Sequence, residues 1–260
     1  MTDHLPGYMA EYVRASLSGT DRSPCSSPSS SPSPSGTDRP YIVFSDVDET
    51  LITVKSMFDF LHYQLVRRHG AAGEEEYGRI AAVIGRRAAD GAPRSDINRF
   101  YYSHYAGESV EAITRLADDW FTERTASTRG FYIDSTRRAL GEHRAAGAPV
   151  VLVSGSFPPL LEPLAREIGA ETVLCTRPLT EDGRYTGEVA APVIGEGKRA
   201  AVLAHLAARP AVDPRDCFAY GDHLSDLPML ELVGHPVAVG EDPELRAHLA
   251  ARRPETTATR

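Results

Sequence analysis

Five short apolar runs alternate with stretches of helical periodicity, and this alternation restricts the possible folds more than any other feature of the sequence. Each run is short and apolar enough to be a strand buried on both faces, as in a parallel sheet. Strands that alternate with helices predict an α/β fold with a doubly wound parallel sheet. The expected strands are residues 42–44, 149–156, 171–175, 216–222 and 235–240, with helices at 157–168, 197–208 and 225–233.

The stretch between the first two strands is far longer than a parallel crossover requires. A crossover needs about a dozen residues or slightly more, but residues 56–146 show only helical patterns. We therefore expect a helical cap inserted after the first strand, over residues 55–128, and a helix at about 131–146 that returns to the core. Asp182-Gly183 lies between polar-alternating arms and predicts a β-hairpin at 176–189.

The ends of the chain differ from its centre. Residues 18–39 are dominated by Ser and Pro and contain no Leu, Ile, Val or Phe. Such a segment cannot bury enough apolar surface to offset its ordering entropy, so we predict a flexible or partly polyproline linker. The segment before this linker has a helical pattern, and it either docks on the main domain or a partner or is a frayed terminus. One face of that helix would be formed by Tyr8, Met9, Tyr12, Val13 and Leu17. The predicted units are an N-terminal segment (1–39), a core (40–54 with 129–249), a cap (55–128) and a flexible tail (250–260).

Composition excludes several classes of protein. With 28 Lys and Arg against 36 Asp and Glu, the net charge of −8 argues against nucleic-acid binding. No apolar run approaches the roughly 20 residues that span a bilayer, so we expect no membrane partner. The first residues lack a basic start followed by an apolar stretch, which favours the cytoplasm. Cys25, Cys175 and Cys217 are too few and too far apart for a CxxC metal site or a disulfide scaffold.

Two pairs of aspartates follow predicted strands. Asp46 and Asp48 lie two residues apart after the first strand, so their side chains leave it on the same side. Asp222 and Asp226 follow the fourth strand, after Gly221, which permits close backbone approach. The carboxyl ends of parallel strands share one edge, where such folds bind ligands, so the four carboxylates are expected to converge. Either pair alone equally fits a solvated turn or the first turn of a helix.

Converging carboxylates require compensating positive charge. At 4 Å and an effective dielectric of 20, each like-charged pair costs about 4 kcal/mol before screening. Hard oxygen ligands suit Mg²⁺, and Lys198, at the start of a predicted helix, would supply further charge. At the end of the second strand, Ser154 and Gly155 offer a hydroxyl and backbone N–H groups, which is typical of a phosphate-binding turn.

Taken in order, four motifs resemble those of the haloacid dehalogenase superfamily: DVDET (46–50), SGS (154–156), GEGK (195–198) and GDHLSD (221–226). The sequence is most similar to subfamily IB, the group that contains phosphoserine phosphatase, whose helical cap is inserted after the first motif. The resemblance covers about residues 41–249. It implies a Rossmann-like core, bound Mg²⁺ and phosphatase activity.

The resemblance also implies a role for each matching residue. Asp46 is the implied nucleophile, which forms an aspartyl-phosphate, and Asp48 is the implied general acid and base. Ser154 and the Gly155 N–H would bind phosphate oxygens, while Lys198 would neutralise the nucleophile and the phosphoryl charge. The implied metal set is the Asp46 carboxylate, the Asp48 carbonyl, Asp222 and, through water or Lys198, Asp226.

These roles predict a Mg²⁺-dependent phosphatase that hydrolyses a small-molecule phosphomonoester as a monomer or homodimer. The presence of Asp48 argues against a dehalogenase, because superfamily dehalogenases lack that acid. Two alternatives stay open. In a phosphotransferase, a second hydroxyl would attack the same aspartyl-phosphate. In a binding or regulatory protein, the site would be retained but catalytically idle.

The substrate is less well determined. In phosphoserine phosphatases a Glu nine residues after the nucleophile binds the substrate ammonium, and here that position is Lys55. A cation there would favour an anionic substrate group, unless Lys55 simply faces solvent. Aromatic residues of the cap are expected to divide between its core and the substrate pocket. Together with Lys55, the expected substrate residues are Arg99 and Tyr102.

Overall fold

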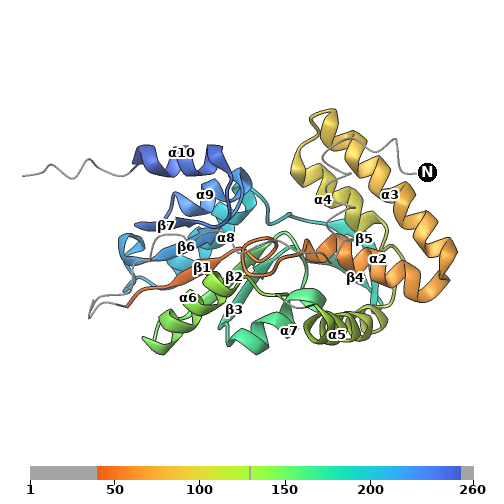
Figure 1. The fold of residues 1–260 in the computed structure, drawn as a ribbon, viewed down its shortest axis with the longest axis horizontal. Helices are drawn as coiled ribbons and strands as arrows, with labels where there is room; N and C mark the ends of the chain where they lie inside the picture. The colour runs from red at the N-terminus through yellow and green to blue at the C-terminus, as the bar shows by residue number, and fades with distance from the viewer. Residues whose placement is uncertain (1–39, 129, 253–260) are drawn as a thin grey trace, which may run out of the picture.

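The computed structural model describes residues 40–128 and 130–252 (Figure 1). The predicted N-terminal helix and Ser/Pro linker lie outside the described residues, as do residues 253–260 of the predicted tail. Residues 250–252 of that tail form the end of helix α10 (Pro243–Arg252). Among the described residues, every helix is too short or too polar to cross a bilayer.

A five-stranded sheet forms the centre of the molecule. Its strands are β1 (Val43–Ser45), β2 (Val150–Ser154), β3 (Thr172–Cys175), β6 (Phe218–Gly221) and β7 (His235–Ala238). They lie in the order β3-β2-β1-β6-β7, and every pairing is parallel. Phe44 is opposite Val151 on one side and Ala219 on the other, and all three are fully buried. The predicted α/β fold with a parallel sheet is confirmed.

Helices cover both faces of the sheet, because its central strands are apolar on both sides. In Figure 1, α6 (Asp134–Ala145) and α7 (Pro158–Ile168) lie on one face, while α8 (Glu196–Ala207) and α9 (Leu227–Leu230) lie on the other. Buried leucines of α7 pack toward the sheet, whereas Arg166 remains exposed. Cys175, the last residue of β3, and Cys217, which precedes β6, are both buried and form no disulfide with each other.

The helix predicted over residues 225–233 is broken. Residues Leu224–Asp226 form a 3₁₀ turn, η2, and only Leu227–Leu230 form the α-helix α9. Pro228, which has no N–H to donate, lies in the first turn of α9, where an N–H has no partner within the helix. The Asp226 side chain accepts hydrogen bonds from backbone N–H groups of the preceding loop, which holds it beside β6.

Four helices lie between β1 and β2, in the segment predicted as the cap. They are α2 (Ser56–His69), α3 (Ala71–Ala89), α4 (Arg94–Ser103) and α5 (Val110–Ser127). Figure 1 shows them gathered as a lobe beside the carboxyl edge of the sheet. As the periodicity predicts, Ile113, Ala117 and Trp120 are fully buried on one face of α5. The exact boundaries of the core and cap units stay a prediction.

Aromatic side chains fill the junction between the lobe and the sheet. Tyr101, Tyr102 and Tyr105 of the α4 region are at most 1% exposed. Phe157, which follows β2, packs edge-on against Tyr102 and Tyr105, with 5.4 Å between ring centroids in each pair. Edge-to-face packing of this kind adds to the burial of apolar area. These three tyrosines of the cap therefore belong to the interior.

The predicted hairpin forms, and it packs on the helical lobe. Strands β4 (Pro178–Glu181) and β5 (Arg184–Val189) pair antiparallel around Asp182-Gly183, both of which have positive φ. The Tyr185 N–H donates to the Glu108 carbonyl at 2.9 Å, and the Gly107 N–H donates to the Tyr185 carbonyl at 2.8 Å. The lobe is therefore built from two separate segments of the chain.

Candidate active site and metal centre

The aspartate that follows β1 lies where two strands end together. Ser45 is opposite Tyr220, and the Asp46 N–H donates to the Tyr220 carbonyl at 3.0 Å. This pairing carries Asp46 to the same edge as Asp222, which follows β6. Asp46 is 7% exposed. The parallel register is thus the reason that two distant parts of the sequence supply neighbouring carboxylates.

Three carboxylates and one ammonium form the centre of the site. Asp46, Asp222 and Asp226 each offer an oxygen, and these oxygens lie within 4.8 Å of one another. The Lys198 Nζ lies 2.6 Å from Asp46 Oδ1 and 2.6 Å from Asp226 Oδ1. Lys198 is itself buried. The structure therefore brings together the predicted nucleophile, the predicted lysine and both acids of the fourth motif.

The three carboxylates differ in how many hydrogen bonds their oxygens accept from the protein. Asp226 Oδ1 accepts from Lys198, and its Oδ2 accepts from the N–H groups of Asp222 and His223 at 3.2 and 3.1 Å. A Cβ on Gly221 would lie 2.6 Å from the Cβ of Asp226, so only glycine allows this close packing. Asp222 accepts from Thr50 at 2.7 Å through Oδ1. Asp226 is therefore committed to the protein, which fits its implied indirect role at a metal.

Burial shifts the protonation of these groups. It raises the pKa of Asp46 to about 8, with Asp226 and Asp222 adding to the shift and Lys198 opposing it. Burial likewise raises the pKa of Asp222 to about 6, and Asp226 adds to that shift. Burial alone would lower the pKa of Lys198, but Asp226 and Asp46 outweigh it and raise that pKa.

The donor chemistry fits a divalent cation. Among the described residues, the carboxylates of the cluster repel one another, and Lys198 alone does not keep the pKa values of Asp46 and Asp222 in the ordinary range. A hard cation with oxygen ligands, such as Mg²⁺, would supply the missing positive charge. Asp46 and Asp222 are the carboxylates that could bind it directly, together with the Asp48 carbonyl.

Asp48 stands beside this cluster with an uncommitted oxygen. Its Oδ1 is buried and accepts no hydrogen bond from any described residue. Burial raises the pKa of Asp48 to about 7, the charge of Asp46 adds to the shift, and hydrogen bonds from Ser56 oppose it. A carboxyl group that titrates near neutral pH can both give and accept a proton, as a general acid and base must.

The predicted phosphate-binding turn is held from two sides. Ser154 is buried, and its Oγ accepts from the Ser156 N–H at 3.1 Å. The Gly155 carbonyl accepts from Asn98 Nδ2 at 3.0 Å and from the Tyr102 hydroxyl at 3.1 Å. A Cβ on Gly155 would lie 2.8 Å from Ile194 Cγ1. The cap therefore contacts this turn directly.

The predicted substrate residues occupy different settings. Tyr102 reaches the turn through its hydroxyl, as just described. Lys55 lies before α2 and pairs with Glu49 at 3.1 Å, where Glu49 adopts a positive φ of 61° in the loop after Asp48. Arg99 is exposed on α4, and its contact with substrate stays a prediction. Sequence reasoning missed Asn98 and Arg94, although the spacing 94, 98, 102 places them on one face of α4.

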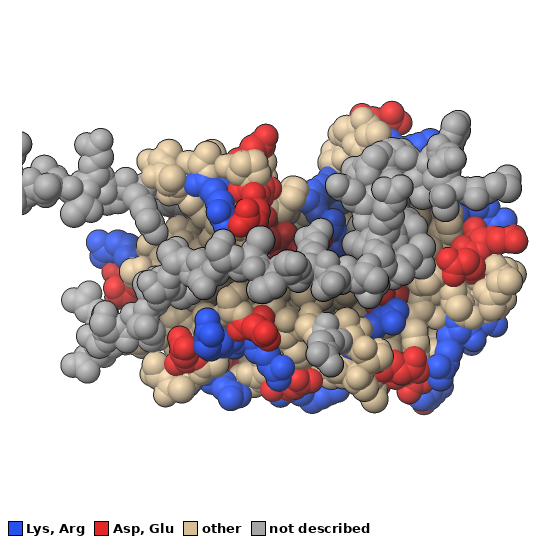
Figure 2. All heavy atoms as spheres, viewed as in Figure 1, with Lys and Arg blue, Asp and Glu red and all other residues tan. Residues whose placement is uncertain are grey.

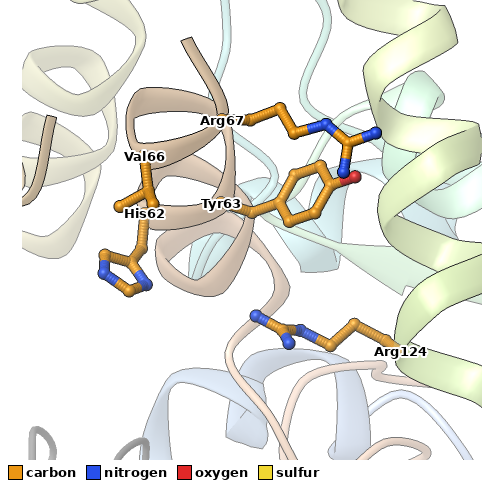
Figure 3. A pocket seen from close by; sticks show the side chains of 5 residues that line it. All are labelled: His62, Tyr63, Val66, Arg67 and Arg124. Atoms are coloured by element: carbon orange, nitrogen blue, oxygen red, sulfur yellow. The ribbon is translucent and has the colours of Figure 1, made fainter. Parts of the chain in front are cut away.

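A surface hollow elsewhere is separate from these residues. It has a volume of about 260 Å³ and is lined by His62, Tyr63, Val66, Arg67 and Arg124 of α2 and α5 (Figure 3). The Tyr63 hydroxyl and Arg67 both donate to Glu123, so the protein already satisfies these polar groups. The hollow includes none of the predicted site residues.

Comparison with known sequences agrees with the geometry. The sequence profile of the haloacid dehalogenase-like hydrolases matches residues 43–231. A probable phosphatase from Mycobacterium tuberculosis is 43% identical over 113 residues, which are 44% of this chain and 39% of that protein. An inhibition of morphological differentiation protein from Streptomyces azureus is 41% identical over 214 residues, 80% of this chain and 75% of that one.

Solved structures extend the comparison to the fold. A protein of unknown function from Bordetella pertussis Tohama I has a TM-score of 0.72 and 26% identity, over 82% of this chain and 96% of that chain. A substrate-bound phosphoserine phosphatase has a TM-score of 0.57 and 20% identity, over 81% and 91% of the two chains. At that identity the second likeness concerns the fold alone.

Proposed function

The chain belongs to the haloacid dehalogenase-like hydrolases, and on that premise we propose that it is a Mg²⁺-dependent phosphatase that hydrolyses a small-molecule phosphomonoester. One observation carries the proposal: Lys198 bridges Asp46 and Asp226 at 2.6 Å each, with Asp222 alongside. The probable phosphatase named among its relatives supports the same reaction class. A monomer or homodimer in the cytoplasm is the accompanying expectation.

The reaction begins with a carboxylate of the buried cluster. Asp46 attacks phosphorus, so that a bond from its oxygen to phosphorus forms while the ester bond to the leaving alcohol breaks. Asp48 gives its proton to the departing alkoxide oxygen. Ser154 and the Gly155 N–H hold phosphate oxygens, and Lys198 offsets the negative charge that the nucleophile and phosphate share. The product of this step is an aspartyl-phosphate on Asp46 and a free alcohol.

Hydrolysis of the aspartyl-phosphate uses the same groups in reverse. Asp48, now ionised, accepts a proton from water as the water oxygen attacks phosphorus. The bond from phosphorus to Asp46 breaks, and inorganic phosphate and the Asp46 carboxylate are restored. The pKa of Asp48, which burial raises to about 7, suits a group that must hold a proton in one step and lose it in the next. Bound Mg²⁺ would supply positive charge at the phosphoryl oxygens.

Turnover of p-nitrophenyl phosphate with Mg²⁺ tests this proposal. Asp46→Asn is expected to reduce kcat by about a thousandfold or more, because an amide is not a competent nucleophile. Asp118→Asn, an exposed carboxylate on α5, serves as the matched control and is expected to keep its activity. Wild-type protein should lose activity in excess chelator and recover it when Mg²⁺ is returned. Near wild-type turnover by Asp46→Asn, or full activity of metal-free protein, would contradict the proposal.

Two further measurements separate the alternatives. Asp48→Asn is expected to accumulate the aspartyl-phosphate, which intact-protein mass spectrometry detects as one added phosphoryl group. The ratio of phosphate released to phosphate transferred onto added alcohols distinguishes a phosphatase from a phosphotransferase. Absence of both turnover and phosphorylation with a panel of phosphorylated sugars, polyols and amino acids would favour the idle binding protein.

A further inference from the structure

One face of α4 is directed at the two loops that flank the nucleophile. Arg94, Asn98 and Tyr102 follow one another at intervals of four residues, which places them along one side of the helix. Asn98 and Tyr102 are buried and bind the carbonyl of Gly155, in the loop after β2. These two contacts fix the position of α4 relative to the sheet. The third residue, Arg94, is thereby held above the loop after β6.

Arg94 has an unusual partner. Its NH1 lies 2.9 Å from His223 Nδ1 and 3.1 Å from Nε2, next in sequence to the predicted metal ligand Asp222. His223 Nδ1 also accepts from the Ser225 N–H at 3.0 Å, so its lone pair is already used. Among the residues the structure describes, no carboxylate forms an ion pair with Arg94. Arg67 and Arg124 of the same lobe, by contrast, pair with Glu123 and Asp59.

A second cation, Lys55, lies at the start of α2 beside the loop that follows the nucleophile, where it pairs with Glu49 at 3.1 Å. Figure 2 shows a notch between the lobe that carries α10 and the lobe that carries α3 and α4, with Lys and Arg atoms on the α4 side. The Arg94 contact with His223 crosses between these lobes. The notch has cations on the α4 side and carboxylates on the α10 side, and Arg94 reaches across it to the loop that carries Asp222.

From this arrangement we infer that Arg94 binds a second anionic group of the substrate. The substrate class is a phosphomonoester that carries a carboxylate or a second phosphate at its far end and lacks an ammonium, which Lys55 would repel. The guanidinium would exchange its contact with the His223 ring for a charge-assisted hydrogen bond to the anion, which is the stronger interaction. This inference rests on the proposed function, because it assumes that the phosphoester lies at Asp46.

Binding of phosphonates tests the inference without requiring turnover. The full chain with Mg²⁺ is titrated by calorimetry with 4-phosphonobutyrate, butane-1,4-diphosphonate and butylphosphonate. The first two have a second anion and the third ends in a methyl group. Wild-type protein is expected to bind at least one of the two probes that have a second anionic group about tenfold more tightly than butylphosphonate. The stronger of the two identifies the anion as carboxylate or phosphate.

Variants assign that preference to a residue. Arg94→Gln is expected to abolish the tenfold preference and leave the affinity for butylphosphonate unchanged, while Arg94→Lys retains part of the preference. Arg79→Gln, an exposed arginine of α3, is the control for net charge of the lobe. Arg99→Gln tests the rival arginine on α4. Thermal unfolding of each variant shows whether the fold is intact.

Several outcomes would overturn the inference. They are equal binding of the three probes by wild type, binding of none of them, an unchanged preference in Arg94→Gln, or selective loss in Arg99→Gln instead. The proposed function fails separately. Suppose that the protein prefers the probes with a second anionic group, that this preference depends on Arg94, and that the protein hydrolyses no phosphomonoester. That result would contradict the phosphatase proposal but would support the anion site at Arg94.

Discussion

The carboxyl edge of the sheet and the inner face of α4 meet at one site, but they are built differently. At the sheet edge, charged groups are buried and tied to one another, as in the Lys198 bridge between Asp46 and Asp226. On α4, two buried neutral groups anchor the helix to Gly155, and a cation lies exposed beyond them. The first arrangement suits chemistry common to every substrate. The second suits selection among substrates, since it can change without disturbing the buried charges.

The largest expected effect comes from the buried charges. Lys198→Gln should reduce turnover of every phosphomonoester by about a thousandfold and lower the free energy of unfolding by about 3–5 kcal/mol, because it leaves buried carboxylates without their partner. Urea unfolding and p-nitrophenyl phosphate kinetics measure the two effects. Mg²⁺ should restore part of the stability but not the activity. A loss confined to one class of substrate would break the distinction between the two regions.

The turn that joins the two regions comes next. Gly155→Ala should reduce kcat/KM for all substrates by roughly ten- to a hundredfold, because the new Cβ displaces the turn from Ile194 and so from the position in which we propose that it binds phosphate. Kinetics with p-nitrophenyl phosphate check this. Since the opposing atoms belong to a side chain, adding Ile194→Ala should recover much of the activity. Failure of that second change to help would mean that the Gly155 backbone, and not its packing, is what matters.

A smaller and more selective effect is expected from Lys55→Glu. If the lysine favours an anionic substrate group, reversing its charge should lower kcat/KM for a phosphoester with a carboxylate by about tenfold. p-Nitrophenyl phosphate, which has no second anion, should change little. Comparison of 3-phosphoglycerate with p-nitrophenyl phosphate provides the measurement. Equal effects on both substrates would assign Lys55 to the Glu49 loop rather than to specificity.

The smallest effect separates stability of the core from catalysis. His143 is buried between the hydroxyls of Tyr41 and Tyr220, and burial lowers its pKa. A histidine with a folded pKa below its unfolded value of about 6.5 stabilises the fold above that pH, and this contribution is lost as the pH falls below it. The loss should approach about 1.4 kcal/mol per pH unit.

Urea unfolding at pH 7 and pH 5 checks this expectation. His143→Gln should reduce the difference in unfolding free energy between the two pH values, whereas His69→Gln, on the exposed end of α2, should leave it unchanged. Substrate preference should be the same in both variants. An undiminished pH dependence in His143→Gln would assign the effect to other groups.

The two regions also differed in what the sequence allowed us to predict. Asp46, Asp222 and Ser154 lie at or just after the ends of apolar runs, and strand ends of a parallel sheet meet at one edge, so their convergence follows from local pattern. Lys198 begins a helix instead, and its place in the site was implied by the need for positive charge and by the family resemblance. The structure brings three of these four residues into contact distance, while their catalytic roles stay proposals. The burial of Asp226 and the hydrogen bonds to both of its carboxylate oxygens could not be predicted from the sequence, because they depend on the geometry of the loop after Gly221.

The local sequence pattern could not predict which face of α4 is directed at the site. Sequence reasoning chose Arg99 and Tyr102 on this helix but not Arg94 or Asn98, which contact the motif loops together with Tyr102. The side of the helix that turns inward is decided by packing of the buried tyrosines at 101 and 102. The short helix α9, with Pro228 in its first turn, was not predicted, and neither was α10. Pairing of the hairpin with the lobe depends on contacts between segments far apart in the chain.

That hairpin has a practical consequence for protein engineering. Because α2 to α5 follow one another between β1 and β2, the simplest exchange of the lobe between related enzymes would splice one continuous segment. Here Tyr185 of β5 forms backbone hydrogen bonds with residues 107 and 108, which lie 78 and 77 residues before it in the chain. In a chimera that exchanges residues 55–128 alone, the new lobe would have to pair with the original β4–β5 hairpin, which did not evolve with it. A successful exchange would have to replace residues 178–189 in the same step.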